Sequence, residues 1–401
     1  MTKVYIVAAK RTAIGKFGGS LSTLSAAEIA VPVIKNIIEE TKIDPAKLDE
    51  VIVGNILMAG QKQGVARQAA INAGIPQEVP AYSLNMICGS GMKAILNAYS
   101  NIKSGEANLI LAGGTETMSG AAFILPSSVR NGIKMGDFKA VDHMVLDALT
   151  DAFEGYHMGV TAENIVEKYN ITREEQDQFA ASSQKKAAAA IDAGNFKNEI
   201  VTISIVSKKE TIIFDTDEYV NRSTNAEKLS TLRPAFKKDG SVTAGNSSGI
   251  NDGASFVLVA SEEAVKQYGL TPLVEIVAVG QGGVDPAIMG MGPVPAIGNA
   301  LKKAGLKLSE IEVVELNEAF AAQSLGVMKQ LCEDHGVNQE WFSTHCNLNG
   351  GAIALGHPVG SSGNRITVSL IHEMKRSGKK LGLASLCIGG GMGTAVVLRN
   401  I

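Results

Sequence analysis

Short apolar runs alternate with amphipathic stretches along the whole chain. The stretches at 26–42 and 295–306 carry an apolar face over about three to four turns, which predicts α-helices. The apolar runs are short and bounded by turn residues, so they predict buried strands. These runs lie at 4–9, 50–56, 108–114, 255–261, 274–280, 313–316 and 381–391. Their alternation with helices indicates an α/β fold around a largely buried sheet.

Two pairs of segments indicate that this fold is duplicated. Residues 43–53 (IDPAKLDEVIV) and 306–316 (LKLSEIEVVEL) share one order of apolar, turn, charged and strand positions. Residues 88–95 (CGSGMKAI) and 360–367 (GSSGNRIT) share Ser-Gly and then a basic residue two positions on. Each member of the second pair is followed by a strand that ends in a glycine cluster. The chain therefore consists of two related halves.

The middle of the chain, roughly 120–250, does not share the repeat. It is polar and predicts one clear helix at 172–194, which begins with the capping box Thr172-x-x-Glu175 and ends at Gly194. An insertion of this kind either covers a site and binds a ligand or elaborates the surface. We expect an N-terminal half at 1–119 completed by 251–270, an inserted loop domain at 120–250, and a C-terminal half at 271–401.

Composition narrows the classes of partner. The chain has 401 residues, 45% of them hydrophobic, with 37 basic against 40 acidic residues and a net charge of −3. This balance gives no electrostatic case for nucleic acid or an anionic membrane surface. The four cysteines are too few for a disulfide framework, so we expect reduced thiols in the cytoplasm. No apolar stretch reaches 18 residues and no signal peptide is apparent, so we expect no membrane span and no secretion.

Cys88 is the first candidate for chemistry. It begins the stretch CGSG, where an apolar run gives way to a predicted helix. A helix start offers free backbone N–H groups and a positive dipole end, which favour the thiolate form of a cysteine. The alternative is a small buried residue, which is the commoner role of cysteine.

Three further residues lie near predicted strand ends, two of them in glycine-rich stretches. His357 lies in a Gly-His-Pro turn, which fixes an imidazole well enough for a base or a hydrogen-bond donor, although a structural role is equally compatible. Cys387 ends a strand and precedes three glycines whose N–H groups can stabilise an oxyanion. The alternative there is a phosphate loop, but the G-x-G-x-x-G spacing is missing. Asn317, in LNEAF, can hold a water or a carbonyl group.

Eight motifs in fixed order extend this picture to the whole chain. They are RTAIGKFGG, NMICGSGMKAI, LAGGTETMS, YHMGVTAENI, TAGNSSGINDGA, NEAFAAQ, NGGAIALGHPVGSSG and LCIGGGMGTA. In these motifs the chain resembles the thiolase family over essentially its full length. The resemblance implies a duplicated five-layered α-β-α-β-α fold with an inserted loop domain that binds coenzyme A. It departs from the family pattern at Asn364, in GSSGNR.

The resemblance also implies a role for each candidate. Cys88 would be the nucleophile that carries an acetyl thioester, and His357 would take the proton from its thiol. Cys387 would remove a proton from the α-carbon of the second acetyl group. Asn317 would hold an oxyanion-hole water, and the backbone N–H groups of Cys88 and Gly389 would form a second oxyanion hole. The implied reaction is the reversible condensation of two acetyl-CoA to acetoacetyl-CoA and CoA.

Substrate contacts are likewise implied by motif match. His157-Met158 is similar to the short-chain members of the family, and the family's arginine near the adenine falls close to Asn221 and Arg222. The pantetheine channel would be lined by Leu149, His157, Met158, Ala244 and Ser248, with Met289 and Phe320 near the acyl group. The resemblance implies acetyl-CoA, acetoacetyl-CoA and CoA as partners, no further cofactor, no metal, and a homotetramer built as a dimer of dimers.

Alternatives of other classes remain at this stage. A ketosynthase-type condensing enzyme of the same fold would lack a second catalytic cysteine, and a non-catalytic lipid-binding protein of this fold would lack the nucleophile or the histidine. A nucleotide-binding dehydrogenase needs a G-x-G-x-x-G motif after its first strand. The cluster Cys332, His335, His345 and Cys346 lacks C-x-x-C spacing, so we expect it to be neither catalytic nor metal-binding.

Overall fold

The computed structural model describes residues 2–206 and 211–401, and most of its strands form one continuous sheet, whose two related halves are the first and the second sheet. The first sheet has the order β4, β3, β5, β11, β1, and the second has the order β12, β15, β14, β13. Antiparallel pairing of Tyr5 with Glu275 and of Ile6 with Val274 joins them. The bounds are β1 Val4–Thr12, β3 Glu50–Gly54, β4 Ala81–Leu84, β5 Leu109–Thr117, β11 Asn251–Ser261, β12 Val274–Gly283, β13 Val313–Leu316, β14 Leu381–Ile388 and β15 Met392–Asn400.

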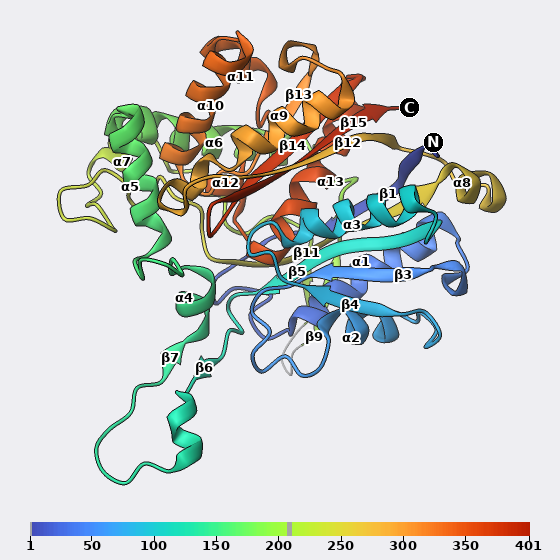
Figure 1. Cartoon of the computed structure of the whole chain (residues 1–401), viewed down its shortest axis with the longest axis horizontal. Helices are drawn as coiled ribbons and strands as arrows, with labels where there is room; N and C mark the ends of the chain where they lie inside the picture. The colour runs from blue at the N-terminus through green and yellow to red at the C-terminus, as the bar shows by residue number, and fades with distance from the viewer. Residues whose placement is uncertain (1, 207–210) are drawn as a thin grey trace.

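Helices cover both outer faces and fill the space between the sheets (Figure 1). Helices α1 (Ala26–Thr41) and α2 (Val65–Asn72) pack on the first sheet, and α9 (Pro293–Ala304) and α10 (Ala321–His335) pack on the second. Helices α3 (Ser90–Ser104) and α13 (Val359–Ser377) share one apolar cluster with strands of both sheets. The predicted α/β fold and its five-layered, duplicated form are therefore confirmed.

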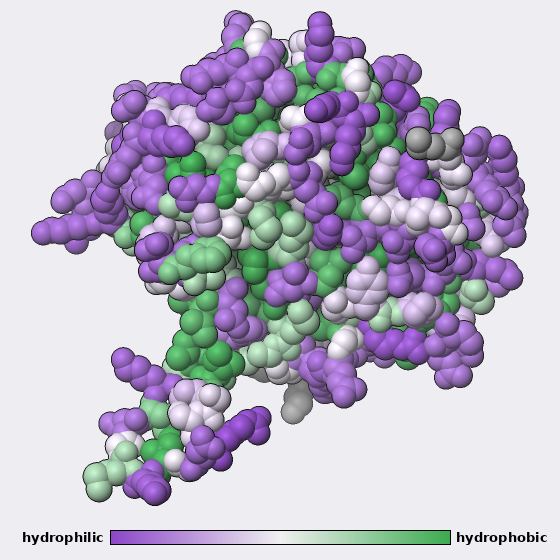
Figure 2. All heavy atoms as spheres, in the orientation of Figure 1, coloured by the Kyte–Doolittle hydropathy of each residue, from purple (hydrophilic) through white to green (hydrophobic). Residues whose placement is uncertain are grey.

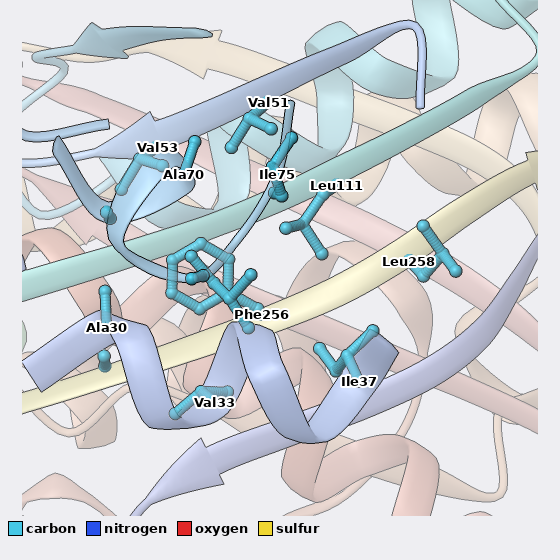
Figure 3. Packing of buried hydrophobic residues seen from close by; sticks show 14 of the residues in the cluster. Ala30, Val33, Ile37, Val51, Val53, Ala70, Ile75, Leu111, Phe256 and Leu258 are labelled. Atoms are coloured by element: carbon cyan, nitrogen blue, oxygen red, sulfur yellow. The ribbon is translucent and has the colours of Figure 1, made fainter. Parts of the chain in front are cut away.

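The outer layer of the first half shows why the apolar pattern folds this way. Ala30, Val33 and Ile37 recur at helical spacing on α1 and lie fully buried against the sheet (Figure 3). They face strand residues such as Leu111 and Phe256, which are also buried. Each such aliphatic or aromatic side chain contributes about 1.5–3 kcal/mol when it is fully removed from water. The burial of this face of α1 thus holds the helix against β5 and β11. The candidate site is built beside these strands.

The first turns of α3 and α13 approach each other at backbone distance. A Cβ atom on Gly91 would lie 2.9 Å from the carbonyl oxygen of Gly360, and one on Gly363 would lie 2.6 Å from the backbone nitrogen of Met92. Only glycine permits this approach. The helix that follows Cys88 is therefore fixed directly against the helix that follows His357.

Most predicted strands differ from the observed ones only at their ends, but β15 and β4 were not predicted. The run at 381–391 ends as a strand at Ile388, where Gly390 and Gly391 take φ +84° and turn the chain into β15. Strand β4 was also missed because its burial is only partial and its apolar pattern is short. The predicted capping box is present: α6 (Arg173–Asp192) begins after Thr172, whose side chain accepts from the N–H of Glu175.

The segment between β5 and β11 is richer in structure than its sequence indicates. Part of it packs on the first half, since β8 pairs with β1, and Ile203 and Phe214 belong to the same apolar cluster as α1. An arm that carries β6 and β7 extends away from the body (Figure 1). The bounds here are β6 Phe123–Ile124, β7 Val141–Asp142, α4 His143–Ala148, α5 Met158–Tyr169, α6 Arg173–Asp192, β8 Ile200–Val201, β9 Ile203–Val206, β10 Thr211–Phe214 and α7 Ala226–Ser230. The remaining elements are β2 Gly15–Lys16, α8 Glu262–Tyr268, α11 Gln339–His345 and α12 Ala352–Leu355. Within the described residues, no helix combines the length and the apolar character that a membrane crossing needs.

Candidate active site

Cys88 lies in a strained turn between β4 and α3. The residue before it, Ile87, has φ +45°, which β-branched residues rarely adopt. Ser90 stabilises this turn, because its Oγ accepts from the N–H of Met86 (2.9 Å) and donates to the carbonyl of Ile87 (2.6 Å). A Cβ on Gly89 would lie 2.3 Å from Ile388, so the turn also packs tightly against the end of β14.

The charge state of Cys88 differs from the sequence-based expectation. Burial raises the pKa of its thiol to about 11, although the backbone N–H groups of Gly389 and of Cys88 itself lower it. The carboxylate of Glu116 adds to the rise. We expected a thiolate from the helix start, but the loss of hydration outweighs the N–H donors. Cys88 is a thiol at neutral pH and needs a base to attack a thioester.

His357 supplies a base with a defined orientation. Gly356, at φ +109°, leaves room for Asn251, whose Oδ1 accepts from the backbone N–H of His357 (2.9 Å). The imidazole Nδ1 lies 2.5 Å from the Oγ of Ser362, which donates its own proton to the carbonyl of Pro358 (3.0 Å). A hydroxyl has one proton to give, so Nδ1 carries the imidazole proton and Nε2 is left as an acceptor.

The surroundings of His357 keep it neutral. Burial and the positive charge of Arg365 lower the pKa of His357 to about 3. The Nδ2 of Asn317 lies 3.5 Å from Nε2 of His357, and the Oδ1 of Asn317 lies 3.5 Å from Nη2 of Arg365. Arg365 therefore points the amide nitrogen of Asn317 toward the imidazole. The N–H of Asn317 donates to Ser385, which fixes its backbone beside β14.

Cys387 lies fully buried near the end of β14. It packs in one apolar cluster with Met158, Met289 and Phe320. Burial and the neighbouring Cys88 raise the pKa of its thiol above the ordinary value of 9.0. A Cβ on Gly389 would contact Ile87 and the sulfur of Met158 at 3.4 and 3.6 Å, so the glycine turn lies between the Cys88 turn and the inserted domain.

A cavity of about 390 Å³ opens onto His357. Its lining includes five of the seven predicted substrate contacts, Leu149, His157, Ala244, Ser248 and Phe320. The other two, Met158 and Met289, lie in the apolar cluster with Cys387. Cys88 does not line the cavity, but it packs in the apolar cluster of Leu149, Met118 and Val359, which do.

His157 forms one wall of this cavity. Its ring stacks on Phe236 with centroids 4.6 Å apart, and Phe236 meets Phe320 edge-on at 6.1 Å. Its Nδ1 accepts from the N–H of Gly159 (3.0 Å), so the proton of the neutral ring is on Nε2. Burial lowers the pKa of His157, which keeps the ring neutral at neutral pH.

Phe236 was missed from the sequence, as were the positioning groups Ser362 and Arg365. Ser362 and Arg365 lie in GSSGNR, directly after the Gly-His-Pro turn, so their spacing from His357 on one helix was a usable signal. Phe236 follows a polar stretch of the insertion, and no local pattern marks it.

The remaining candidates lie elsewhere. Arg222 pairs with Asp192 at 2.7 Å on the exposed surface, beside Asn221. Cys346 lines a second cavity of about 390 Å³, and its carbonyl accepts from Lys186 (3.2 Å). Cys332 lies on α10. In the part of the chain that the structure describes, no group of three or more His, Cys, Asp or Glu side chains is arranged to hold a metal ion.

Comparison with known proteins agrees with this geometry. The family model described as thiolase, N-terminal domain, matches residues 4–263, and thiolase, C-terminal domain, matches residues 270–400. An acetyl-CoA acetyltransferase of Pseudomonas aeruginosa is 52% identical over 399 residues, or 99% of each chain. One from Escherichia coli is 50% identical over 401 residues, or 100% of each chain.

Solved structures give the same result. The acetyl-CoA acetyltransferase from Syntrophomonas wolfei superposes with a TM-score of 0.97 at 40% identity over 100% of both chains. Human mitochondrial 3-ketoacyl-CoA thiolase in complex with CoA superposes with a TM-score of 0.93 at 44% identity, over 100% of this chain and 98% of the other. With both domain models matched and relatives of this similarity over its whole length, the chain belongs to the thiolase family.

Proposed function

We propose that this acyltransferase catalyses the reversible condensation of two acetyl-CoA to acetoacetyl-CoA and CoA through an acetyl thioester on Cys88. One observation carries the proposal: a cysteine in a strained turn, an imidazole with a free Nε2 and a second buried cysteine meet beside one cavity. The relatives named acetyl-CoA acetyltransferase support the choice of substrate.

In the first half reaction the sulfur of Cys88 attacks the thioester carbonyl of acetyl-CoA. Nε2 of His357 takes the thiol proton and returns it to the departing CoA sulfur. The N–H groups of Cys88 and Gly389, which face the sulfur of Cys88, are placed to stabilise the oxyanion. One thioester replaces another of similar energy, so the step is readily reversible.

In the second half reaction Cys387 removes a proton from the methyl group of a second acetyl-CoA. The enolate oxygen that forms is stabilised by His357 and by a water held by Asn317, which lies 3.5 Å from the imidazole. The enolate carbon attacks the acetyl carbon on Cys88, and the new carbon–carbon bond forms as the bond from that carbon to the sulfur of Cys88 breaks. The Cys88 thiolate then takes the proton that Cys387 had removed, which returns Cys387 to the thiolate form in which it acts as the base. The products are acetoacetyl-CoA and the free enzyme.

The test is thiolysis with two matched cysteine variants. Acetoacetyl-CoA and CoA are mixed with the wild type, Cys88→Ala or Cys332→Ala, and acetyl-CoA is quantified. We expect activity from the wild type and from Cys332→Ala, whose cysteine lies on α10, and a loss of at least about 10³-fold for Cys88→Ala. An inert wild type, or a Cys88→Ala variant that retains activity, would refute the proposal.

We further propose a homotetramer, built as a dimer of dimers, in the cytoplasm. Apolar side chains on the arm support assembly, since Phe123 is 69% exposed and Met135 is 95% exposed, and green residues recur along the arm in Figure 2. All four cysteines are free, which fits a reducing compartment such as the cytoplasm.

Light scattering after size-exclusion chromatography tests the proposed tetramer. A wild type with the mass of one chain would contradict it, and Phe123→Ser with Met135→Ser should reduce the mass.

A further inference from the structure

A fully buried carboxylate on β5 joins the two halves of the molecule at the start of α13. Oε2 of Glu116 accepts from the backbone N–H groups of Ile56 (3.0 Å) and Gly360 (3.0 Å). Oε1 accepts from the N–H of Leu57 (3.1 Å) and from the side-chain amide of Asn55 (2.8 Å). All four partners are donors, so the site requires a group that only accepts.

Glu116 caps α13 from the other half of the molecule. The residue before α13 is Pro358, and no side chain of the chain's own N-cap position satisfies the first N–H groups. A carboxylate at a helix start both accepts these hydrogen bonds and complements the positive end of the dipole. In the described part of the chain, Glu116 has no Lys or Arg partner, so N–H donors alone oppose the burial that raises its pKa to about 7.

This cap lies three residues after His357. The carbonyl of Pro358 accepts from the N–H groups of Ser361 (2.8 Å) and Ser362 (3.0 Å), so the first turn of α13 is one hydrogen-bonded unit. That unit includes Ser362, which orients the imidazole. The contact with the carboxylate is close, because a Cβ on Gly360 would lie 2.5 Å from Oε2 of Glu116.

We propose that Glu116 is a positioning residue for this reaction: it holds the first turn of α13 against the first half, and so fixes His357 relative to Cys88. This inference rests on the proposed function of the same site. Glu116 does not line the cavity and touches no substrate. Cys88 belongs to the first half and His357 to the second, so the distance between them depends on contacts that cross the two halves.

The test variant is Glu116→Gln, which keeps the shape but places an NH₂ group against at least one N–H donor. We expect kcat to fall about 10–100-fold per folded site, since small displacements of reacting groups have effects of this size. The KM for CoA should stay within about threefold, because CoA binding precedes the step that is damaged. The matched control is Glu50→Gln. Glu50 begins β3, whereas the partners of Glu116 follow the end of that strand, so this variant should behave as the wild type.

The second readout is alkylation of Cys88 by iodoacetamide across pH, followed by mass spectrometry of the Cys88 peptide. The imidazole takes the thiol proton in the proposed reaction, so its displacement should slow the alkylation of Cys88 in Glu116→Gln at neutral pH. If Glu116 acted only through its charge, its removal would make the thiolate easier to form, and alkylation at neutral pH would become faster.

Three outcomes overturn the inference: kcat within about twofold of the wild type, alkylation at neutral pH that is faster than in the wild type, or a loss of kcat that only follows the folded fraction with an unchanged alkylation rate. Gly360→Ala displaces the same carboxylate from the other side and should give the same signature, which covers the case in which Glu116→Gln does not fold. An inert wild type would refute the proposed function instead, and the alkylation profiles would still be readable.

Discussion

Helices α3 and α13 occupy the same place in the two halves, yet their first turns are completed in opposite ways. At the start of α13 the N–H of Gly360 is taken by the carboxylate of Glu116, 3.0 Å away. At the start of α3 no side chain caps the helix, and the N–H of Cys88 faces its own sulfur. A first turn whose N–H groups already donate hydrogen bonds is held rigidly in place. A first turn whose N–H groups have no side-chain cap can donate to a negative charge that develops on a ligand. In the proposed reaction the duplicated fold therefore separates two roles: the first half carries the nucleophile Cys88, and the second half carries the base His357.

The largest expected effect comes from Cys387, which lies on β14 in the second half. Cys387→Ala should lower condensation by about 10²–10⁴-fold, because the α-proton loses its base. Acetylation of Cys88 should persist, since that step uses groups at the two helix starts. Rapid-quench measurement of CoA released in the first turnover with acetyl-CoA separates the two steps. If the first-turnover release is lost as well, proton abstraction is not the separate role of Cys387.

A smaller effect should follow from the serines at matching positions of the two helices. Ser362→Ala removes the acceptor of the Nδ1 proton, so both tautomers of His357 become accessible. The loss of one such hydrogen bond corresponds to about 1–2 kcal/mol, or roughly tenfold in kcat, with a changed pH profile.

Ser90→Ala is the matched variant in the first half. It removes the hydrogen bonds to Met86 and Ile87 that hold the Cys88 turn, so it should lower stability and kcat while the pH profile keeps its shape. If steady-state pH profiles of the two serine variants coincide, Ser362 does not set the tautomer.

These two serines also show how far the sequence carried the prediction. The alternation of apolar runs and the repeat were sufficient for an α/β fold with two related halves, because apolar periodicity and helix caps are local properties of the sequence. The five layers were implied only by the resemblance of the motifs to the thiolase family. Cys88, His357 and Asn317 were named because each lies beside a recognisable turn. Glu116 was not, since its role depends on a contact across 244 residues that only the packing of the two halves reveals. Ser362 was missed although it lies only five residues after His357, where the local spacing was a usable signal. The thiolate expected at Cys88 was wrong because burial cannot be read from a motif.

His157 belongs to the insertion rather than to either helix start, so a change at this part of the cavity wall should alter substrate choice instead of the chemistry. His157→Ala removes the ring that stacks on Phe236. The loss of an aromatic pair of about 0.5–1.5 kcal/mol predicts a KM for acetoacetyl-CoA raised about 3–10-fold. It should also improve turnover of 3-oxoacyl chains longer than four or five carbons relative to the wild type. The control is the rate at which Cys88 is alkylated in His157→Ala and in the wild type. A difference between the two rates would show that His157 affects the reactivity of Cys88.

The last prediction concerns the free energy of unfolding. His357 of the second half should lower it at acid pH, and Cys88 of the first half should lower it at alkaline pH. The pKa of His357 is lowered from 6.5 to about 3, so below pH 6.5 the unfolded chain binds a proton that the folded chain refuses, and stability is lost as pH falls toward 3. The pKa of Cys88 is raised from 9.0 to about 11, so the folded chain keeps a proton that the unfolded chain releases, and stability is lost as pH rises from 9 toward 11. Each contribution has a limiting slope of about 1.4 kcal/mol per pH unit.

Urea unfolding of the wild type, His357→Asn and Cys88→Ala at pH 5, 7 and 10 should resolve both slopes. His357→Asn should flatten the acid side only, and Cys88→Ala should flatten the alkaline side only. Glu116 and Glu315, with pKa values raised by burial to about 7 and about 8, titrate in all three proteins, so the differences between variants isolate the reactive groups. If His357→Asn keeps the wild-type acid slope, the imidazole is not held neutral by its burial beside Arg365. In that case only the hydrogen bond to Ser362 would leave Nε2 of His357 unprotonated. The second half would then position the imidazole without affecting its charge.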